Sequence, residues 1–201
     1  GIGRKSSGLP GRKWGAGMKQ KPHTAVLLAA GRGRRQRPYT DHTPKPLLPV
    51  DGRATLDYVL AAAAEAGVQT VCLVTHHLSE QIEQYVGDGS AWNLSAVFCR
   101  QPHLAGTAHG LQTAVSAHPT LFTRELPFIL TATDYVLPPD YLANLTAAHI
   151  HNGSDMTISL KRLRLEEIMA SSSAQLSHDG QIGQIIEKPA PEQISSPLAA
   201  S

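Results

Sequence analysis

The sequence predicts an α/β protein in which helices cover both faces of a mostly parallel, mixed sheet, an αβα sandwich. The first observation behind this class is that short apolar runs, typical of buried strands, alternate with longer segments of helical period. Such alternation favours a parallel or mixed sheet with helices on both faces. The second is that polar and charged residues follow several strands, at the edge where sheets of this kind bind ligands.

The expected elements follow one another in a regular order. The first strand, 24–30, has the sequence TAVLLAA and is almost wholly apolar, as in a strand buried on both faces. A helix at 55–66 is closed by Gly67, a common helix stop signal. The other strands of this sheet are expected at 70–75, 94–100 and 127–133, and the other helices at 78–86, 107–117 and 139–150.

The last third of the chain is less regular. Further strands are expected at 155–163 and 181–187, with a short one near 173–177. The tail, 190–201, is rich in Pro, Ser and Ala and is expected to be a loop.

The first residues have a different composition. Residues 1–17 are rich in Gly, Ser and basic residues and lack apolar periodicity, so we expect a disordered leader added ahead of a native start at Met18. A basic arm with a function of its own is the alternative. A single domain is expected over 18–201.

Composition excludes a membrane protein and a disulfide framework. No run of about 18 apolar residues is present, and the N-terminus lacks the apolar segment of a signal peptide. Cys72 and Cys99 both fall in expected strands, which favours buried thiols in a reducing compartment. The protein is therefore expected to be cytoplasmic, with no membrane partner.

The charge is unevenly distributed. The formal net charge is +2, but residues 1–22 contain six bases and no acid, which leaves 12 bases against 16 acids in the rest. Four of those 12 bases lie between residues 32 and 37. One local cationic focus on an acidic body suits a small anionic ligand rather than a nucleic acid, which needs a broad basic face.

The most informative segment is 26–50, VLLAAGRGRRQRPYTDHTPKPLLPV. A strand that ends in glycines exposes backbone N–H groups, and these groups and the nearby cations together form a site for a polyanion such as a triphosphate. The spacing matches neither the dinucleotide-binding pattern G-x-G-x-x-G nor the P-loop pattern G-x-x-x-x-G-K-[ST]. This loop, Gln101 and Asp134 all follow strand ends, which predicts one shared site.

Three motifs in this segment resemble those of the sugar-1-phosphate nucleotidyltransferases. They are L-A-A-G-x-G-x-R at 28–35, P-x-T at 38–40 and P-K-x-L-L-P-V at 44–50. The resemblance extends to about residue 189 and implies a Rossmann-like fold of the nucleotide-diphospho-sugar transferase type. It implies an enzyme that transfers a nucleoside monophosphate, from UTP or dTTP in the favoured case, to a sugar 1-phosphate.

The resemblance also implies roles for individual residues. Gln101 would contact the edge of the base, and Gly106 and Thr107 would lie beside it. Gly33 belongs to the same nucleotide-binding loop. The residues that would line the base and ribose are Leu28, Ala29, Ala30 and Gly31.

The remaining roles concern phosphates, the metal and the sugar. Arg35 would hold the β- and γ-phosphates, and Lys45 would contact the α-phosphate and the incoming sugar phosphate. Asp134 would bind the Mg²⁺ cofactor. Glu187 would bind a sugar hydroxyl and Lys188 the sugar phosphate. A metal and fixed cations are needed because two anions must meet at the reacting phosphorus.

Each of these residues also has a simpler interpretation. Arg32, Arg34 and Arg37 could be surface charges, and Asp134 could cap a turn. Gln101 needs no ligand to explain it, and Glu187–Lys188 could be a surface ion pair. The scattered histidines, including the pairs His76-His77 and His149-x-His151, have too few partners for a zinc site.

Two features depart from the family pattern. Thr133 stands where the family has Gly before the metal-binding aspartate, which predicts a slightly tighter pocket. The family's second metal ligand follows a further strand after the E-K-P segment, so the C-terminal part of the domain is expected to be missing.

Three functions remain open: the sugar-phosphate enzyme; an enzyme that acts on phosphocholine, N-acetylmuramate 1-phosphate or another small phosphate; and a nucleotide-binding module without turnover. A homo-oligomer is compatible with all three.

Overall fold

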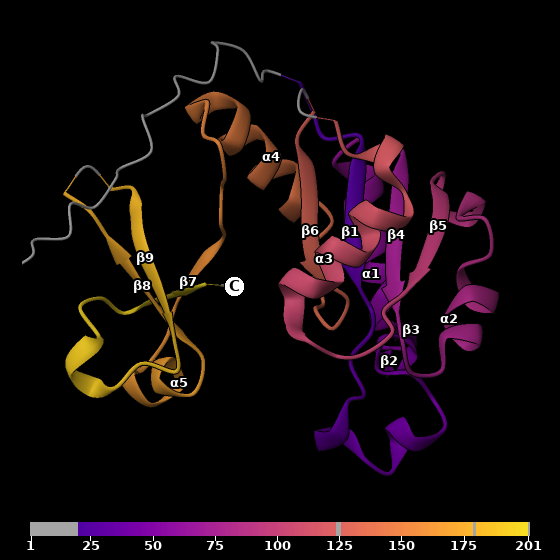
Figure 1. The fold of residues 1–201 in the computed structure, drawn as a ribbon, viewed down its shortest axis with the longest axis horizontal. Helices are drawn as coiled ribbons and strands as arrows, with labels where there is room; N and C mark the ends of the chain where they lie inside the picture. The colour runs from indigo at the N-terminus through magenta and orange to yellow at the C-terminus, as the bar shows by residue number, and fades with distance from the viewer. Residues whose placement is uncertain (1–19, 124–125, 179, 201) are drawn as a thin grey trace, which may run out of the picture. The chain divides into compact units, whose positions relative to one another are not determined.

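The computed structural model describes residues 20–123, 126–178 and 180–200. The chain divides into two compact units, one that ends at Gly153 and one that begins at Ser154. The predicted leader, 1–17, lies outside the described residues. Figure 1 shows the elements of both units, and each unit is described by itself below.

The first unit contains a four-stranded parallel sheet, as the sequence predicts. Its strands are β1 (Thr24–Leu28), β4 (Thr70–Thr75), β5 (Ser95–Arg100) and β6 (Phe128–Ala132), in the order β5-β4-β1-β6. All three pairs of neighbours are parallel. β1 is therefore a central strand, and Leu28 at its end lies opposite Val74 of β4 and Ala132 of β6.

The helices of this unit are α1 (Thr55–Glu65), α2 (Ser79–Val86), α3 (Gly106–Ala117) and α4 (Tyr141–Asn152). The chain moves outward from β1 to β4 and β5, and then returns through α3 to β6 on the other side of β1. The direction of winding reverses between β1 and β6, and open α/β sheets bind ligands in the crevice at such a reversal. The two loops that follow β1 and β6 meet there.

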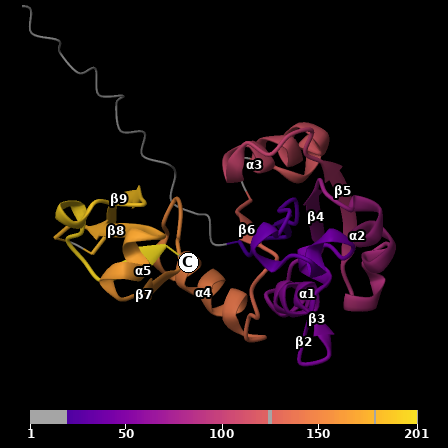
Figure 2. The same ribbon diagram turned by 90° about the horizontal axis from the view of Figure 1, so that it is seen from below.

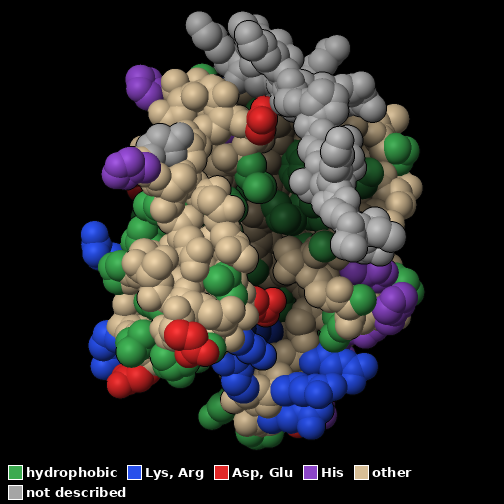
Figure 3. All heavy atoms as spheres, turned by 60° about the vertical axis from the view of Figure 1, so that its left-hand side comes forward, with side chains coloured by type: hydrophobic (Ala, Val, Ile, Leu, Met, Phe, Trp, Pro, Cys, Tyr) green, Lys and Arg blue, Asp and Glu red, His purple; other side chains and the backbone are tan. Residues whose placement is uncertain are grey.

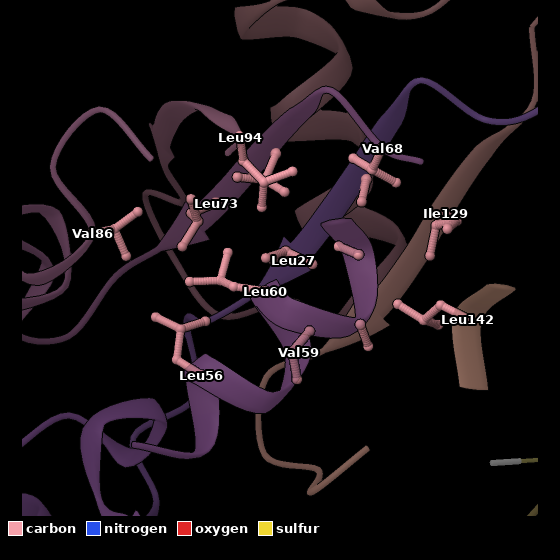
Figure 4. Packing of buried hydrophobic residues seen from close by; sticks show 14 of the residues in the cluster. Leu27, Leu56, Val59, Leu60, Val68, Leu73, Val86, Leu94, Ile129 and Leu142 are labelled. Carbon is pink, nitrogen blue, oxygen red and sulfur yellow. The ribbon is translucent and has the colours of Figure 1, made fainter. Parts of the chain in front are cut away.

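Apolar residues on the two faces of the sheet form two separate clusters. Ala25, Leu27 and Ala29 pack with α1 and with residues of α2 and α4, whereas Val26 packs under α3. This follows from the alternation of side chains along a strand. Figure 2 shows α3 on one side of the sheet and α1 on the other, and Figure 4 shows the larger cluster. The predicted αβα sandwich is confirmed in this unit.

Helix α1 forms the centre of the larger cluster. Leu56, Val59, Leu60 and Ala63 are spaced at i, i+3, i+4 and i+7, and all four are fully buried. The alanine-rich sequence TLDYVLAAAAE combines high helix propensity with side chains small enough to approach the sheet.

The first unit also contains short elements that the sequence analysis did not predict. Between β1 and α1 lie three single-turn 3₁₀ helices and a two-stranded hairpin: η1 (Arg34–Gln36), η2 (Tyr39–Asp41), η3 (Lys45–Leu47), β2 (Pro49–Val50) and β3 (Arg53–Ala54). Two further 3₁₀ helices are η4 (Ser90–Trp92) and η5 (Pro119–Leu121). Elements of two or three residues are too short to produce a period in the sequence.

The second unit is built from antiparallel pairs. β8 (Ser172–Leu176) pairs with β9 (Ile182–Glu187), and β7 (Leu160–Arg162) pairs with β10 (Leu198–Ala200). A short helix, α5 (Leu165–Met169), and a 3₁₀ helix, η6 (Pro191–Gln193), complete it. The strands predicted near 173–177 and at 181–187 are confirmed.

Two predictions for this unit were wrong. The strand predicted over 155–163 is limited to Leu160–Arg162, and the tail at 190–201 is not a plain loop because it contains β10. β10 consists of Leu and two Ala, a composition without strand propensity, and its hydrogen bonds to β7 place it in a sheet. Among the helices of the described residues, none is long and apolar enough to cross a membrane.

The structure predicts a large stability cost for truncation of Leu60. Leu60→Ala removes a fully buried side chain at the contact of α1 with the sheet, so we expect the free energy of unfolding to fall by about 2–5 kcal/mol. Urea denaturation followed by circular dichroism measures this change. Leu104→Ala is the matched control, since that side chain is 47% exposed and should cost less than about 1 kcal/mol. Equal losses in the two variants would contradict the packing described here.

Candidate functional site

The loop after β1 is held in place by a close contact between Gly33 and Thr40. Gly33 has a φ of +61°, and a Cβ at this position would lie 2.7 Å from Thr40 Cγ2 and 3.3 Å from Lys45 Cβ. Buried Thr40 donates a hydrogen bond from Oγ1 to the Gly33 carbonyl oxygen at 3.0 Å. A residue with a side chain at position 33 would therefore push the glycine loop away from Lys45.

Lys45 is positioned by a second set of contacts. Pro46, which follows it, is buried, and the Pro46 carbonyl accepts a hydrogen bond from Thr55 Oγ1 at 2.9 Å. Thr55 is the first residue of α1, and its backbone N–H also donates to the Leu48 carbonyl at 3.2 Å. The start of α1 thus anchors the turn that carries Lys45.

The Lys45 ammonium donates a hydrogen bond to Asp134 Oδ2, and the two groups form an ion pair across 89 residues of sequence. Both side chains keep contact with solvent, with 27% of Lys45 and 35% of Asp134 exposed. Asp134 follows β6 by two residues, so the pair joins the loops at the ends of β1 and β6. The carboxylate that the sequence assigned to a metal is neutralised by a cation of the chain itself.

Thr133 ties the end of β6 to the end of β1. Its side chain is buried, and Oγ1 donates a hydrogen bond to the Leu28 carbonyl at 3.1 Å. The threonine hydroxyl is therefore satisfied inside the fold. The next residue, Asp134, is held beside the glycine loop as a result. Burial, together with the negative charge of Asp134, raises the pKa of neighbouring Tyr135.

Two hollows meet at Arg35, Lys45 and Asp134, which line both of them. The smaller, of about 290 Å³, is also lined by Leu28, Ala29, Gly31, Gly33, Arg34, Pro46, Ala132 and Thr133. The larger, of about 430 Å³, is also lined by Gln36, Arg37, Tyr39, Leu48, Pro49, Val50, Thr55 and Val136. Lys and Arg side chains gather toward the bottom of the molecule in Figure 3, the end where the loop after β1 lies in Figure 1.

The structure brings most of the predicted phosphate and nucleotide residues together. Of the predicted base and ribose residues, Ala30 is buried and lines neither hollow. According to the sequence analysis, Arg34 and Arg37 could be simple surface charges. In the structure Arg34 lines the smaller hollow and Arg37 lines the larger one. The sequence analysis did not identify Tyr39, although this residue occupies the variable position of the P-x-T motif, nor did it predict the hydrogen bond of Thr133.

The residues predicted to read the base lie at the same end of the sheet, in a separate cluster. Gln101 directly follows β5, is only 3% exposed, and donates from Nε2 to the Gly106 carbonyl at 3.4 Å. Gly106 and Thr107 begin α3 and are exposed. His109, which the sequence analysis did not single out, contacts the Gln101 amide through Nδ1 at 2.7 Å.

Glu187 and Lys188 belong to the second unit. Glu187 ends β9 opposite Ser172, and the Lys188 backbone N–H donates to the Ser171 carbonyl at 2.8 Å. Lys188 has a positive φ of 47°, which is uncommon for a residue with a side chain. Both side chains are exposed, and their sugar and phosphate roles stay predictions.

The donor set at Asp134 suits a magnesium ion that is bound together with phosphates. Within the described part of the chain, no group of three or more His, Cys, Asp or Glu side chains could hold a metal by itself. Magnesium prefers oxygen ligands and is commonly held by one or two carboxylates, with substrate phosphates and water completing its shell. The Lys45 ammonium already forms an ion pair with this carboxylate, in the place where a metal cation would bind.

Comparison with known proteins finds nucleotidyltransferases among the relatives of this chain. An N-acetylmuramate alpha-1-phosphate uridylyltransferase of Neisseria meningitidis is 37% identical over 127 residues, which cover 62% of this chain and 52% of the relative. A mannose-1-phosphate guanylyltransferase of Mycobacterium tuberculosis is 32% identical over 139 residues, which cover 69% of this chain and 37% of the relative. The chain thus spans about half the length of these relatives or less.

A solved structure shares the fold. A UDP-glucose pyrophosphorylase in complex with UDP-glucose superposes with a TM-score of 0.74 at 20% identity, over 89% of this chain and 74% of that one. The family profile described as nucleotidyl transferase matches residues 24–200, which include both units and every predicted site residue. The chain belongs to the nucleotidyl transferase family, whose members among these relatives are sugar-1-phosphate nucleotidyltransferases.

Proposed function

We propose that this chain carries the active site of a Mg²⁺-dependent enzyme that transfers a nucleoside monophosphate from UTP or dTTP to a sugar 1-phosphate and releases pyrophosphate. The observation that carries the proposal is the meeting of Arg35, Lys45 and Asp134 at one point between two hollows. Family membership supports the reaction class, and the choice of nucleotide, metal and acceptor is our own inference.

The main requirement of the reaction is that the protein neutralises negative charge. An oxygen of the sugar phosphate attacks the α-phosphorus, a new P–O bond forms, and the bond from the α-phosphorus to the bridging oxygen breaks as pyrophosphate leaves. The attacking oxygen is already an anion, so no general base is required. The protein must bring two anions together and stabilise the charge on the departing group.

Arg35 and Lys45 suit two different parts of this task. The forked donors of an arginine match the oxygens of the departing phosphates, and the ammonium of Lys45 is a compact charge that suits the reacting centre. In the free protein that ammonium is paired with Asp134. We infer that Lys45 turns from the carboxylate to the phosphates when the nucleotide binds.

Asp134 is the residue that would hold the metal. A bound Mg²⁺ supplies Lewis-acid stabilisation of the phosphate oxygens. Asp134 also keeps Lys45 at the reaction centre, and Thr133 holds Asp134 there through its bond to the end of β1.

The acceptor is proposed to be a sugar 1-phosphate because both reported relatives are named for one. A uridylyltransferase among them supports the choice of UTP, although the other relative uses the guanine nucleotide. Glu187 and Lys188 are proposed to contact the sugar and its phosphate. We propose the cytoplasm as the location, since Cys72 and Cys99 are free thiols whose sulfur atoms lie 3.9 Å apart in the core.

The first test is a substrate panel. We expect the full-length protein with Mg²⁺ to release pyrophosphate when UTP or dTTP is paired with a sugar 1-phosphate, and a coupled pyrophosphate assay measures this. Phosphocholine and other small phosphates belong in the panel as rival acceptors. Nucleotide binding with no pyrophosphate from any pairing would favour a binding module and refute the enzyme.

The second test concerns Arg35. Arg35→Ala removes a forked donor from both hollows, so we expect affinity for UTP to fall about tenfold or more while UMP affinity changes little. Isothermal titration calorimetry measures both. Arg32→Ala is the matched control because Arg32 lies in the same loop and lines neither hollow. Unchanged UTP binding in Arg35→Ala would remove this residue from the site.

The third test uses the ion pair of Lys45 with Asp134. If Lys45 competes with a metal for this carboxylate, Lys45→Met should tighten the weak Mn²⁺ binding that Asp134 provides before a nucleotide adds its phosphate oxygens. The pair is partly exposed, so a gain of up to about fivefold is expected. Electron paramagnetic resonance measures free Mn²⁺. Asp134→Asn should abolish the binding, and exposed Lys21→Met should leave it unchanged. Equal Mn²⁺ affinity in all variants would contradict the assignment of Asp134.

A further inference from the structure

We propose that His109 is a positioning residue that fixes the amide of Gln101 with its carbonyl oxygen free for the nucleobase. This orientation selects a base whose ring nitrogen carries a hydrogen at that point, as N3 does in uracil and thymine. The inference rests on the proposed function, because it assumes that a nucleotide binds at this end of the sheet.

The backbone of Gln101 is fixed on both sides. Its N–H donates to the carbonyl of Thr75, the last residue of β4, at 2.8 Å. Its carbonyl oxygen lies 2.8 Å from His76 Nδ1. With 3% of the residue exposed, the side chain has little freedom to move. Gln101 therefore has the rigidity that selective recognition of a ligand requires.

The orientation of the amide follows from its partners. Nε2 lies 3.4 Å from the Gly106 carbonyl oxygen and 2.7 Å from His109 Nδ1. A carbonyl oxygen can only accept, so the amide nitrogen, and not the oxygen, must face this side. Nδ1 of His109 then has to accept as well, which places the ring proton on Nε2. Both hydrogens of the Gln101 amide are used inside the protein.

The oxygen of the same amide, unlike its nitrogen, has no hydrogen-bond partner among the described residues. This atom, Gln101 Oε1, is not sealed from solvent. A Cβ placed on Gly110 would lie 3.8 Å from this oxygen and 2.9 Å from Leu28 Cδ2. Leu28 lines the smaller hollow, so Oε1 stands next to the wall of the proposed nucleotide site. The missing side chain at Gly110 keeps the space between them open.

A single free acceptor at this place distinguishes bases by whether the ring nitrogen that faces it donates or accepts a hydrogen bond. The N3–H of uracil or thymine donates to Oε1, whereas N3 of cytosine and N1 of adenine present a lone pair that repels it. A bound base covers this acceptor, and a base that leaves it unpaired is penalised. His109 maintains this selectivity, since without its Nδ1 acceptor only the 3.4 Å contact with the Gly106 carbonyl opposes a turn of the amide group that would present its N–H groups instead.

The packing of His109 supports a fixed ring. The His103 ring lies against it with centroids 4.5 Å apart and planes inclined at 32°. His109 lies in the first turn of α3, one residue before Gly110, so the same helix sets the ring and opens the space beside Oε1. A purely structural histidine would stabilise α3 and leave the choice of base unchanged.

Nucleotide binding in the presence of Mg²⁺ tests the proposal. Calorimetry on the protein should show UTP bound about tenfold or more tightly than CTP and than N3-methyl-UTP, in which a methyl group replaces the N3 hydrogen. In His109→Leu both ratios should fall below about threefold. His109→Asn, whose Oδ1 can replace the Nδ1 acceptor, should restore them. Exposed His151→Leu on α4 should behave as the unaltered protein.

The outcomes separate this inference from the proposed function. If UTP and N3-methyl-UTP bind equally to the unaltered protein, or if His109→Leu keeps both ratios, the inference is overturned and the proposed function stands. If no nucleoside triphosphate binds, both are overturned. A readout that needs no nucleotide is ¹⁵N NMR of the histidine rings: unprotonated Nδ1 in His109 supports the proposal, and a protonated Nδ1 refutes it.

Discussion

The parallel pairing of β1 with both β4 and β6 is the constraint on which the site depends. It brings three strand ends to one edge of the sheet, and the reversal of winding between β1 and β6 leaves the loops after these two strands facing each other. The bond from Thr133 to Leu28 and the ion pair of Lys45 with Asp134 join those loops. Residues 89 positions apart thereby form one charged centre.

Two cations of the site are paired with carboxylates before any ligand arrives. Asp134 holds Lys45, and Arg37 is paired with Asp41 at 3.1 Å. Arg34 and Arg35 form no ion pair with the described residues, and Arg35 is the one of the two that lines both hollows. On the proposed function, an incoming polyphosphate would meet these unpaired arginines and a lysine that must exchange partners. Such exchange links the binding of the metal to that of the phosphates, since each changes the cost of the other.

Recognition of the base depends on a different kind of contact. The loop after β1 offers charge and open space, and neither distinguishes one base from another. Gln101 is nearly buried and presents one unpaired oxygen, so its selectivity comes from the fixed direction of a neutral group. In the proposed site, phosphate binding and base choice thus lie on loops after different strands, β1 and β5.

The sequence alone determined the fold class and the positions of the four sheet strands with their helices, and it indicated the loop of 26–50 as the candidate site, because buried strands and dense motifs leave strong local patterns. It could not reveal β10 or the 3₁₀ turns of the loop, which are too short for any period. Only the tertiary structure decided that Lys45 pairs with Asp134, that Thr133 bonds to Leu28, and that His109 contacts the Gln101 amide. These contacts join residues on different elements, and their partners are set by strand order and helix placement, which no local pattern records.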